Sequence, residues 1–339
     1  NEYGADSLRF TLISMASPGR DVKLSKDRVT GNRNFITKIW SANNFLKLNN
    51  CKLDKKINLT SIKLPINHWI YNEFIKTQNL ITKNIEIFRF DEAARYAYQF
   101  VWHSYCDWYL EFLKPIFNSK NKSEIKEAKA FSSFMMANIL RILHPFIPFF
   151  TENLWSLNAY KKIFNNYLIS SSWPNFKVIN KFSNNQNNIN DLIEIISNIR
   201  STKAELKITP KLYCDIFFDD KSGKLKKLVN KNINLIKQVG RVNNVLTTKI
   251  RDKNSIDILV LKEKLSLNFN EDVNLGSQKE RILQKIETIN KQIINLNNKL
   301  KNKAYVTNAP KEIVQNDKNL VKELTIEDGK LRSIVSSIN

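Results

Sequence analysis

Cysteine and glycine are both scarce in this sequence of 339 residues. Its three cysteines, Cys51, Cys106 and Cys214, are far apart, which excludes a disulfide framework and a four-cysteine zinc site and fits a reducing cytosol. Only seven glycines occur, and no glycine-rich phosphate loop is among them. Long apolar periodicities with so few glycines are typical of a helix bundle.

The sequence also lacks long apolar runs. None approaches the roughly 18 to 20 residues that a membrane span requires, and the mean hydropathy is −0.38. We therefore expect no membrane partner and a cytoplasmic location. Hydrophobic residues still make up 42% of the chain, which is enough for a sizeable core. The chain does not begin with methionine, and Asn1 directly precedes a predicted helix, so we expect a piece of a longer protein.

Acidic residues are too few to balance the basic ones. Lys and Arg number 54 against 32 Asp and Glu, which gives a formal charge of +22. Such a surplus favours a nucleic-acid partner, because neutralising phosphates releases condensed counterions. A merely basic surface is the alternative, since an AT-rich genome explains abundant Asn and Ile, although it explains the charge less well. A membrane-surface helix is disfavoured, because the basic residues are dispersed over the whole chain.

The first 160 residues are predicted to be almost entirely helical, because apolar residues recur at helical spacing. Asp91 is expected to cap one helix and Pro115 to limit it. The segment 146–150 is expected to be a buried connector. The predicted helices span 5–16, 25–48 (apolar at Val29, Ile36, Ile39, Trp40 and Leu46), 65 to about 89, 91–113, 123–144 and a short one from Thr151.

Residues 161–188 are predicted to be a polar linker, with a low-complexity stretch at 184–188. A small α/β unit is then predicted over 189–275. Its elements are helices at 191–206 and 225–239 and strands at 213–218, 245–250 and 256–261.

The last 60 residues show two heptad seams on either side of a break at 304–310, which predicts an antiparallel helical hairpin. Asp317 and Asp328 stand where the second seam would continue with apolar residues. Seven basic residues against two acidic ones over 279–303 favour a surface that faces phosphates. The seams are Ile282, Ile286, Ile289, Ile293, Leu296 and Leu300, and then Val314, Val321, Leu324, Leu331, Val335 and Ile338.

Few residues suggest chemistry. His103, Cys106 and Asp107 are spaced to share one face of a helix, so a metal site is conceivable, but aromatic residues surround them and no fourth ligand is apparent. A packed helix is the favoured interpretation. The segment 23–27, Lys-Leu-Ser-Lys-Asp, resembles the ATP loop of class I aminoacyl-tRNA synthetases, but it lacks the final serine of that loop.

A longer resemblance explains this segment differently. In order and spacing, the chain resembles the valyl-tRNA synthetase family after its ATP loop, and the resemblance covers nearly the whole chain. The ATP loop of that family would precede residue 1, which makes 23–27 a coincidence. The segments that carry the resemblance are 3–10 (Tyr-Gly-Ala-Asp-Ser-Leu-Arg-Phe), 15–24, 33–40, Trp102 with 105–111, 143–149, 151–155, Trp173-Pro174, 200–205 (Arg-Ser-Thr-Lys-Ala-Glu) and 304–314.

The resemblance implies a mainly α fold with three parts: an anticodon-binding helix bundle, a small α/β unit and a C-terminal antiparallel coiled-coil arm. The implied divisions are 1–24 as a stem-contact segment, 25–160, 161–188 as a linker, 189–275, and 276–339 as the tRNA-binding arm.

The same resemblance implies that the parent enzyme joins valine to its tRNA with ATP and magnesium and hydrolyses mischarged threonine. The family's catalytic and editing domains are missing from this chain, so we expect it to contain no catalytic residue, cofactor or metal site and to contact valine and ATP only through the missing part. The implied partner is valine-specific tRNA, and the implied state is a monomer.

Site residues follow from the family's contacts. Lys38 and Phe45 lie where its anticodon contacts fall, and their spacing of seven places them on one helix face; Lys38 is expected to bond a base or phosphate and Phe45 to stack. Arg28 or Arg33 is expected to supply a further cation. A core role for Phe45 is the alternative. The expected contacts of the arm with tRNA phosphates are Lys279, Arg281, Lys285, Lys291 and Lys299.

Two other interpretations remain open at this point. One is a non-catalytic basic helical scaffold that binds RNA or a partner helix. The other is the isoleucyl relative, whose C-terminus usually carries cysteine-ligated zinc, a cluster that this sequence lacks.

Overall fold

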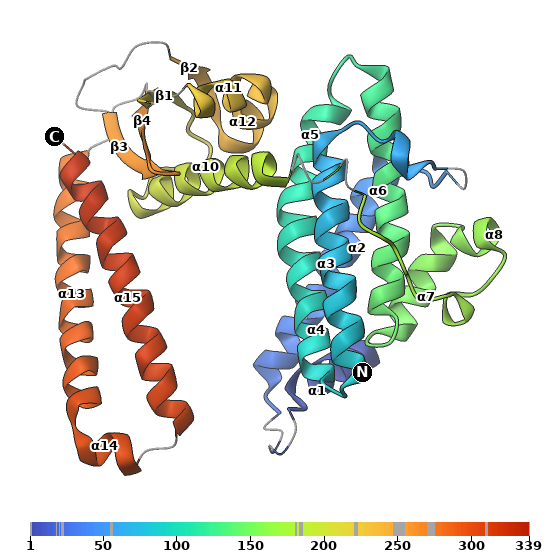
Figure 1. The fold of residues 1–339 in the computed structure, drawn as a ribbon, viewed down its shortest axis with the longest axis horizontal. Coiled ribbons are helices and arrows are strands. Elements are labelled where there is room, and N and C mark those ends of the chain that lie inside the picture. The colour runs from blue at the N-terminus through green and yellow to red at the C-terminus, as the bar shows by residue number, and fades with distance from the viewer. Residues whose placement is uncertain are drawn as a thin grey trace. The chain divides into compact units, whose positions relative to one another are not determined.

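The structure is a computed structural model, and it describes residues 2–17, 19, 21, 24–54, 57–179, 182, 186–219, 223–246, 255–269, 275–308 and 311–338. The chain divides into two compact units, Asn1–Asn190 and Asp191–Asn339. The first is helical, and the second combines a four-stranded sheet with a long helical hairpin (Figure 1). The predicted mainly α class is confirmed. The predicted domain boundaries stay predictions.

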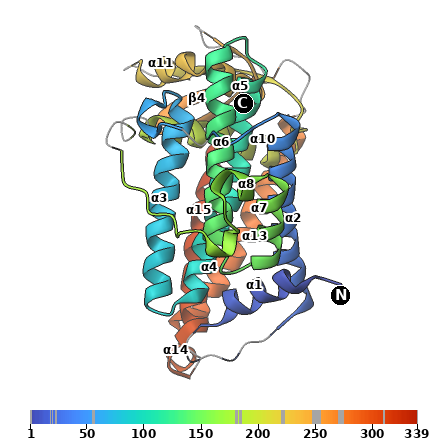
Figure 2. The same ribbon diagram turned by 90° about the vertical axis from the view of Figure 1, so that its right-hand side faces the viewer.

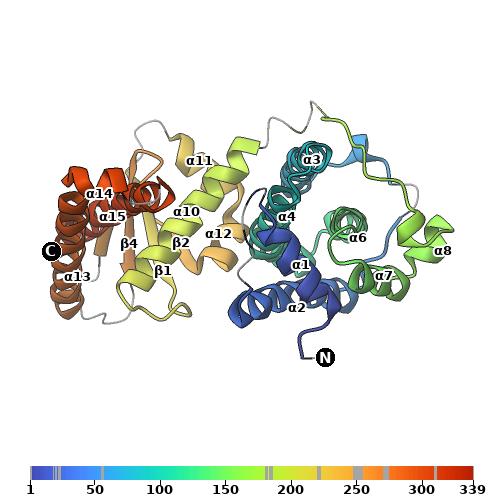
Figure 3. The ribbon, with the colours of Figure 1, turned by 90° about the horizontal axis from the view of Figure 1, so that it is seen from below.

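The first unit is a bundle with an extra layer of short helices. Two long helices, α3 and α6, run beside the continuous α4–η2–α5 segment (Figures 1 and 3). Helix α1 contacts α2, α4 and α7 (Figure 2). The elements are α1 (Ala5–Met15), α2 (Lys26–Leu48), η1 (Leu59–Ser61), α3 (Pro65–Glu86), α4 (Phe90–Gln99), η2 (Phe100–Tyr109), α5 (Leu110–Phe117), α6 (Lys122–Leu143), α7 (Pro148–Leu157), α8 (Tyr160–Phe164) and η3 (Leu168–Ser170).

The helix predicted at 91–113 is longer and less regular than expected. Its N-cap is Arg89, and Asp91 lies in the first turn, where a carboxylate interacts favourably with the positive end of the helix dipole. Pro115 lies inside α5, buried with Leu113, so packing outweighs the hydrogen bond that proline removes. Between α4 and α5 the chain forms a π-helix of ten residues, η2, a rare form that often marks functional sites.

The connector after α6 and the following polar segment are also more structured than the sequence suggests. Helix α7 begins at Pro148, before the expected Thr151, and Phe149 is 67% exposed rather than buried. Residues 173–177 and Phe182 pack along α3. Trp173 donates to the Thr82 hydroxyl at 2.9 Å, and the Phe182 ring stacks on His68 with centroids 3.9 Å apart.

The second unit is built on a sheet with the strand order β2-β1-β4-β3, in which β1 pairs in parallel with β2 and antiparallel with β4. Helix α10 carries the chain into this unit. The elements are α10 (Gln186–Glu205), β1 (Cys214–Asp219), α11 (Lys224–Lys231), α12 (Ile233–Gly240), β2 (Val242–Val245), β3 (Ser255–Val260), β4 (Glu263–Phe269), α13 (Leu275–Lys301), α14 (Lys303–Asn308) and α15 (Lys311–Ser337).

Three sequence predictions for this unit need correction. The helix predicted at 225–239 is two helices, because the Asn232 side chain bonds the Leu228 carbonyl and ends α11. Strand β2 precedes the predicted 245–250, of which residues 247–250 lie outside the described part of the chain. Strand β4 has no counterpart in the sequence prediction. Its hairpin turn places Leu261 and Lys262 at positive φ. Turns of this kind usually contain Asn-Gly or a similar pair, so Leu-Lys provides no turn signal in the sequence.

The predicted hairpin of heptad helices is confirmed as α13 and α15, and the break between them contains α14. Within the described residues, no helix is both long and apolar enough to cross a membrane.

Glu127 of α6 anchors the start of α3. Its carboxylate accepts bonds from the Lys63 and Leu64 amides at 3.0 and 2.8 Å and from the Asn67 side chain at 2.9 Å. We expect Glu127→Gln to lower the free energy of unfolding of the first unit by about 1.5–3 kcal/mol, because charged acceptors of backbone amides are replaced by weaker ones. Urea denaturation measures this, with the exposed Glu86→Gln as a control that changes it by less than about 0.5 kcal/mol. Equal effects of the two substitutions would contradict the anchoring role.

Asp91 gives the first unit an acid-sensitive bond. The Arg89 guanidinium donates to both carboxylate oxygens at 2.9 Å and lowers the pKa of Asp91 from 3.8 to about 2. Because the pKa is lower in the folded state, this stabilisation is complete above about pH 4 and is lost as the pH falls toward 2. We expect about 1 kcal/mol, allowing for the solvent around Arg89. Asp91→Asn removes this part of the pH dependence in melting curves between pH 2 and 5; an unchanged pH dependence would show that the pair contributes nothing.

Candidate nucleic-acid interface

Helix α2 displays the four residues predicted to contact the anticodon. The Ser25 hydroxyl caps its first turn by accepting from the Arg28 amide at 3.4 Å, which gives the segment resembling an ATP loop a structural role. Buried Phe35 and Ile39 fix the inward face of the helix. Arg28 and Arg33 are therefore exposed, within about three turns of Lys38.

Lys38 lies at the contact between α2 and η2. Its Nζ atom is 3.1 Å from Oδ1 of Asp107 and 5.3 Å from the centroid of the Trp102 ring. Oδ2 of Asp107 is 3.5 Å from Nδ1 of His103. The Lys38 side chain is 38% exposed, so a positioned ammonium, with donors left over from the bond to Asp107, reaches solvent beside a carboxylate.

An aromatic stack supports this ammonium. Trp102 and Tyr98 are nearly parallel, with centroids 5.5 Å apart and planes at 13°, and both rings are half-buried. Buried Phe35 lies 4.7 Å from Tyr98. Three aromatic side chains from α2, α4 and η2 thus form a layered edge next to Lys38.

Phe45 lies about two turns further along α2 and contacts α5. Its ring stacks on Phe117 of α5, with centroids 5.9 Å apart and planes at 29°, and the Lys129 ammonium lies 6.0 Å from the Phe117 centroid. Phe45 is half-buried, so the structure places it between the predicted stacking role and the alternative core role.

The π-helix changes the expected metal face. His103 is exposed, whereas Cys106 is buried, so these two side chains do not share a surface. Burial raises the pKa of the Cys106 thiol to about 12, which keeps it protonated. In the described ranges, no group of three or more His, Cys, Asp or Glu residues is placed to hold a metal ion.

Sequence reasoning missed two features of this surface. It placed Trp40 in the apolar rhythm of α2, yet Trp40 is 39% exposed, and it lies seven residues from both Arg33 and Lys47. That spacing, equal to the spacing of Lys38 and Phe45, was the available signal. It also did not pair Asp107 with Lys38, because residues 69 positions apart meet only through the fold.

The arm holds most of its predicted cations through bonds within the chain. The Lys279 ammonium donates to the Ile338 carbonyl at 2.8 Å, and the Arg281 guanidinium donates to the Glu205 carbonyl. Lys285 bridges carboxylates of Glu205 at 3.1 Å and Glu327 at 2.8 Å, and these bonds raise its pKa.

Further along α13 the pairs are more exposed. Lys291 pairs with Glu287 at 2.7 Å within one helix, and both side chains are about two-thirds exposed. Lys299 pairs with Asp317 at 3.0 Å, and the Tyr305 hydroxyl donates to the same carboxylate at 2.7 Å. The polar residue that interrupts the second seam is therefore an acceptor that joins α13, α14 and α15. Asp328, the other interruption, pairs with Arg332 at 2.7 Å.

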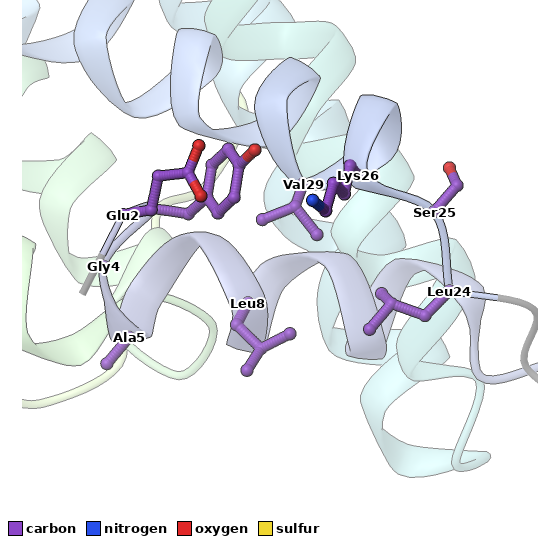
Figure 4. A pocket seen from close by; sticks show the side chains of 9 residues that line it. Glu2, Gly4, Ala5, Leu8, Leu24, Ser25, Lys26 and Val29 are labelled. Atoms are coloured by element: carbon purple, nitrogen blue, oxygen red, sulfur yellow. The ribbon is translucent and has the colours of Figure 1, made fainter.

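A groove of about 640 Å³ lies between the starts of α1 and α2 (Figure 4). Gly4 and Leu8 line one side, and Leu24 and Val29 line the other; Leu8 and Leu24 are 41% and 52% exposed. Gly4 has a φ of 78°, a backbone conformation that favours glycine. Among the side chains that line the groove no catalytic constellation is present.

Two family models match the chain. One, described as the anticodon-binding domain of tRNA ligase, matches residues 67–218, and the other, described as the valyl tRNA synthetase tRNA binding arm, matches residues 274–339.

Curated relatives agree with both matches. The valine–tRNA ligase of Pelagibacter ubique is 42% identical over 94% of this chain, that of Mesorhizobium japonicum 34% over 98%, and that of Agrobacterium fabrum 32% over 100%. This chain spans 36% of the length of each of them. One solved chain, Agrobacterium radiobacter LeuRS in a ternary complex with tRNA and LeuAMS, covers 74% of this chain and 30% of its own length with a TM-score of 0.39 at 12% identity, too remote to support an argument.

The chain thus belongs to the valyl-tRNA synthetase family and corresponds to the part of those enzymes that carries the anticodon-binding domain and the tRNA-binding arm.

Proposed function

We propose that this chain binds valine-specific tRNA, with α2 and η2 at the anticodon loop and the arm on the body of the tRNA. The single observation that carries the proposal is the presence of an anticodon-binding domain and a valyl-type tRNA-binding arm on one chain of charge +22. The geometry of Lys38 is what an anticodon site requires, because unpaired bases are recognised by stacking on aromatic rings and by hydrogen bonds to their edges.

The surface at Lys38 offers both kinds of contact. Its ammonium has three donors, and Asp107 takes one, so two remain for a base edge or a phosphate. The stacked Trp102 and Tyr98 rings lie beside it, and Phe45 lies about 10 Å further along the same helix face. Arg28 and Arg33 add exposed positive charge on α2.

The arm offers phosphate contacts of a different kind. The Lys291–Glu287 pair is about two-thirds exposed, and such a pair is worth little to stability, so an RNA phosphate competes readily for the lysine. Lys299 is 46% exposed, so its ammonium also reaches solvent, although its partner Asp317 is largely buried. Lys279, Arg281 and Lys285 hold the base of the arm while leaving a positive potential there. Contacts of this type orient the RNA without reading its sequence.

As part of a whole enzyme, the chain would serve a valine–tRNA ligase that attaches valine to its tRNA with ATP and magnesium. In that setting the activation chemistry and the editing of threonine belong to regions outside this chain. A monomer in the cytoplasm is the expected context.

Lys38→Gln should lower the affinity for valine tRNA about tenfold and reduce the preference over an anticodon-altered tRNA, because a charged hydrogen bond to RNA is lost. Filter binding with the two tRNAs measures both quantities.

Asp107→Asn tests whether Lys38 acts in tRNA recognition or only holds α2 to η2 through the ion pair. It removes the charge of the partner of Lys38, but it keeps the lysine and a side-chain oxygen that can accept its hydrogen bond, so we expect a smaller loss of affinity than from Lys38→Gln. Lys76→Gln on α3, where Lys76 pairs only locally with Glu73 at 2.9 Å, is the matched control. If Lys38→Gln and Asp107→Asn weakened binding equally, the ion pair would be structural and the role of Lys38 in recognition would be wrong.

Replacing Lys285, Lys291 and Lys299 together with Glu should weaken tRNA binding and flatten its dependence on salt. The phosphate contacts of Lys291 and Lys299 each account for about 0.7–0.9 of the slope of log affinity against log salt, and the reversed charge at Lys285 lowers the positive potential at the base of the arm, so the slope should fall by about 2 in total. The measurement is a titration between 50 and 300 mM KCl.

Lys291→Glu is the cleanest single variant, because its partner Glu287 lies on the same helix turn and no other described element is disturbed. Lys76→Glu makes the same charge change on the bundle and serves as the control. An unchanged slope for the triple variant, with its melting temperature maintained, would remove the arm from the proposal.

A further inference from the structure

The α/β unit contains a buried lysine that holds two loops together. Lys203, on α10, is 3% exposed, and its ammonium donates to the carbonyls of Leu212 at 2.8 Å and Arg241 at 3.2 Å. The Arg241 carbonyl directly precedes Val242, the first residue of β2, and the Leu212 carbonyl lies two residues before Cys214, the first residue of β1. The Cys214 amide also donates to the Arg241 carbonyl at 3.2 Å. One buried cation thus brings Tyr213 and Arg241 to the same edge of the sheet.

Tyr213 and Arg241 form an exposed pair at that edge. The Arg241 guanidinium lies 5.7 Å from the centroid of the Tyr213 ring and donates to its hydroxyl at 3.2 Å. Tyr213 is 37% exposed, and Arg241 is exposed as well. A ring of this kind, with a cation beside it, is the combination that binds an unpaired base and its phosphate.

The backbone around the pair shows a second regularity. Lys207 follows the end of α10 and Arg241 follows the end of α12, and both have positive φ, 51° and 56°. Glycine is the usual residue at such positions, and other residues there cost free energy. Each helix is thus followed by a cationic residue that lies in the loop rather than in the last helical turn.

No opposing charge is present in the two loops. Residues 206–213 and 240–246 contain no acidic residue, and Lys211 adds a further exposed cation to the first of them. Glu205, directly before the first loop, pairs with Lys285 at 3.1 Å. Asp215, two residues after that loop, is buried and accepts from the Asn244 amide and side chain at 3.0 Å. The charged residues of the two loops themselves are therefore all basic, and they stand beside one aromatic ring.

We propose that Tyr213 and Arg241, flanked by Lys207 and Lys211, form a second RNA-binding site, which takes an unpaired nucleotide of the bound tRNA and its adjoining phosphates. The base stacks on Tyr213, and the cations contact the phosphates. Lys203 is a positioning residue, because it holds the two loops and is itself buried. This site rests on the proposed function, since it assumes that the chain binds tRNA.

The first test removes the flanking charges. Lys207→Asn, which keeps a residue that tolerates positive φ, is combined with Lys211→Gln. Because two phosphate contacts are lost, the slope of log affinity for valine tRNA against log salt should fall by about 1.5.

The matched control is Lys262→Asn with Lys264→Gln, in which asparagine again replaces a lysine at positive φ. It makes the same charge change in the same unit, but Lys264 lies opposite Asp219 in the strand register, at the other end of β1. The control pair should leave the slope unchanged. Equal slopes for the two double variants overturn the proposal.

The second test addresses the ring. Tyr213→Ala should lower the affinity about tenfold, and Tyr213→Phe, which keeps the ring, should lower it less. Tyr213 replaced by p-benzoylphenylalanine should crosslink to the tRNA under ultraviolet light, whereas the same replacement of Leu259, exposed on β3, should not. Crosslinking only to protein, or equally from both positions, overturns the proposal.

The outcomes separate this site from the proposed function. If the unaltered chain fails to bind tRNA, both are wrong. If it binds tRNA and responds to Lys38→Gln but not to changes at Lys207, Lys211 and Tyr213, the second site alone is wrong.

Discussion

The contact between Lys38 and Asp107 joins α2 to η2, and the candidate anticodon surface depends on it. Without Asp107 the lysine would be one of many mobile cations on a chain of charge +22. With it, the ammonium is held within 5.3 Å of the Trp102 centroid and remains partly open to solvent. Carboxylates are fewer than cations in this chain, and Asp107 is one that fixes the position of a lysine. In the arm, Asp317 does the same, because it accepts bonds from both Lys299 and Tyr305.

The π-helix makes this contact possible. A regular α-helix over 100–109 would place His103, Cys106 and Asp107 on one face, as the sequence spacing suggests. The wider turn leaves Cys106 in the core with Tyr105 and Tyr109, and it leaves His103 and Asp107 at the surface facing α2. The π-helix thus presents a surface that contains an ion pair and an aromatic stack, and π-helical segments often occur at functional sites.

Buried or partly buried polar side chains give a structural role to two of the segments that carry the family resemblance. Asp6, from the Tyr-Gly-Ala-Asp segment, accepts from the Phe150 amide at 2.6 Å and so caps α7. Burial raises its pKa, while the backbone bonds and nearby Arg9 oppose that rise. Arg200 and Lys203, from the segment at 200–205, bond carbonyls at the end of α12 and beside β1. These residues hold elements together, so the segments 3–10 and 200–205 have a structural role in the fold.

The sequence by itself determined the class of the fold, the long helices of the first unit and the two seams of the arm, because helical periodicity and cap residues are local signals. It also determined the charge and, through the quoted segments, the family. Only the tertiary structure decided the π-helix, the central strand β4 and the exposure of Trp40, because long-range packing outweighs local preference at each of them. It likewise decided which acceptor holds each lysine. Lys38 and Asp107, or Lys203 and the carbonyl of Arg241, are far apart along the chain, and no local pattern records a hydrogen bond that forms only when distant elements meet.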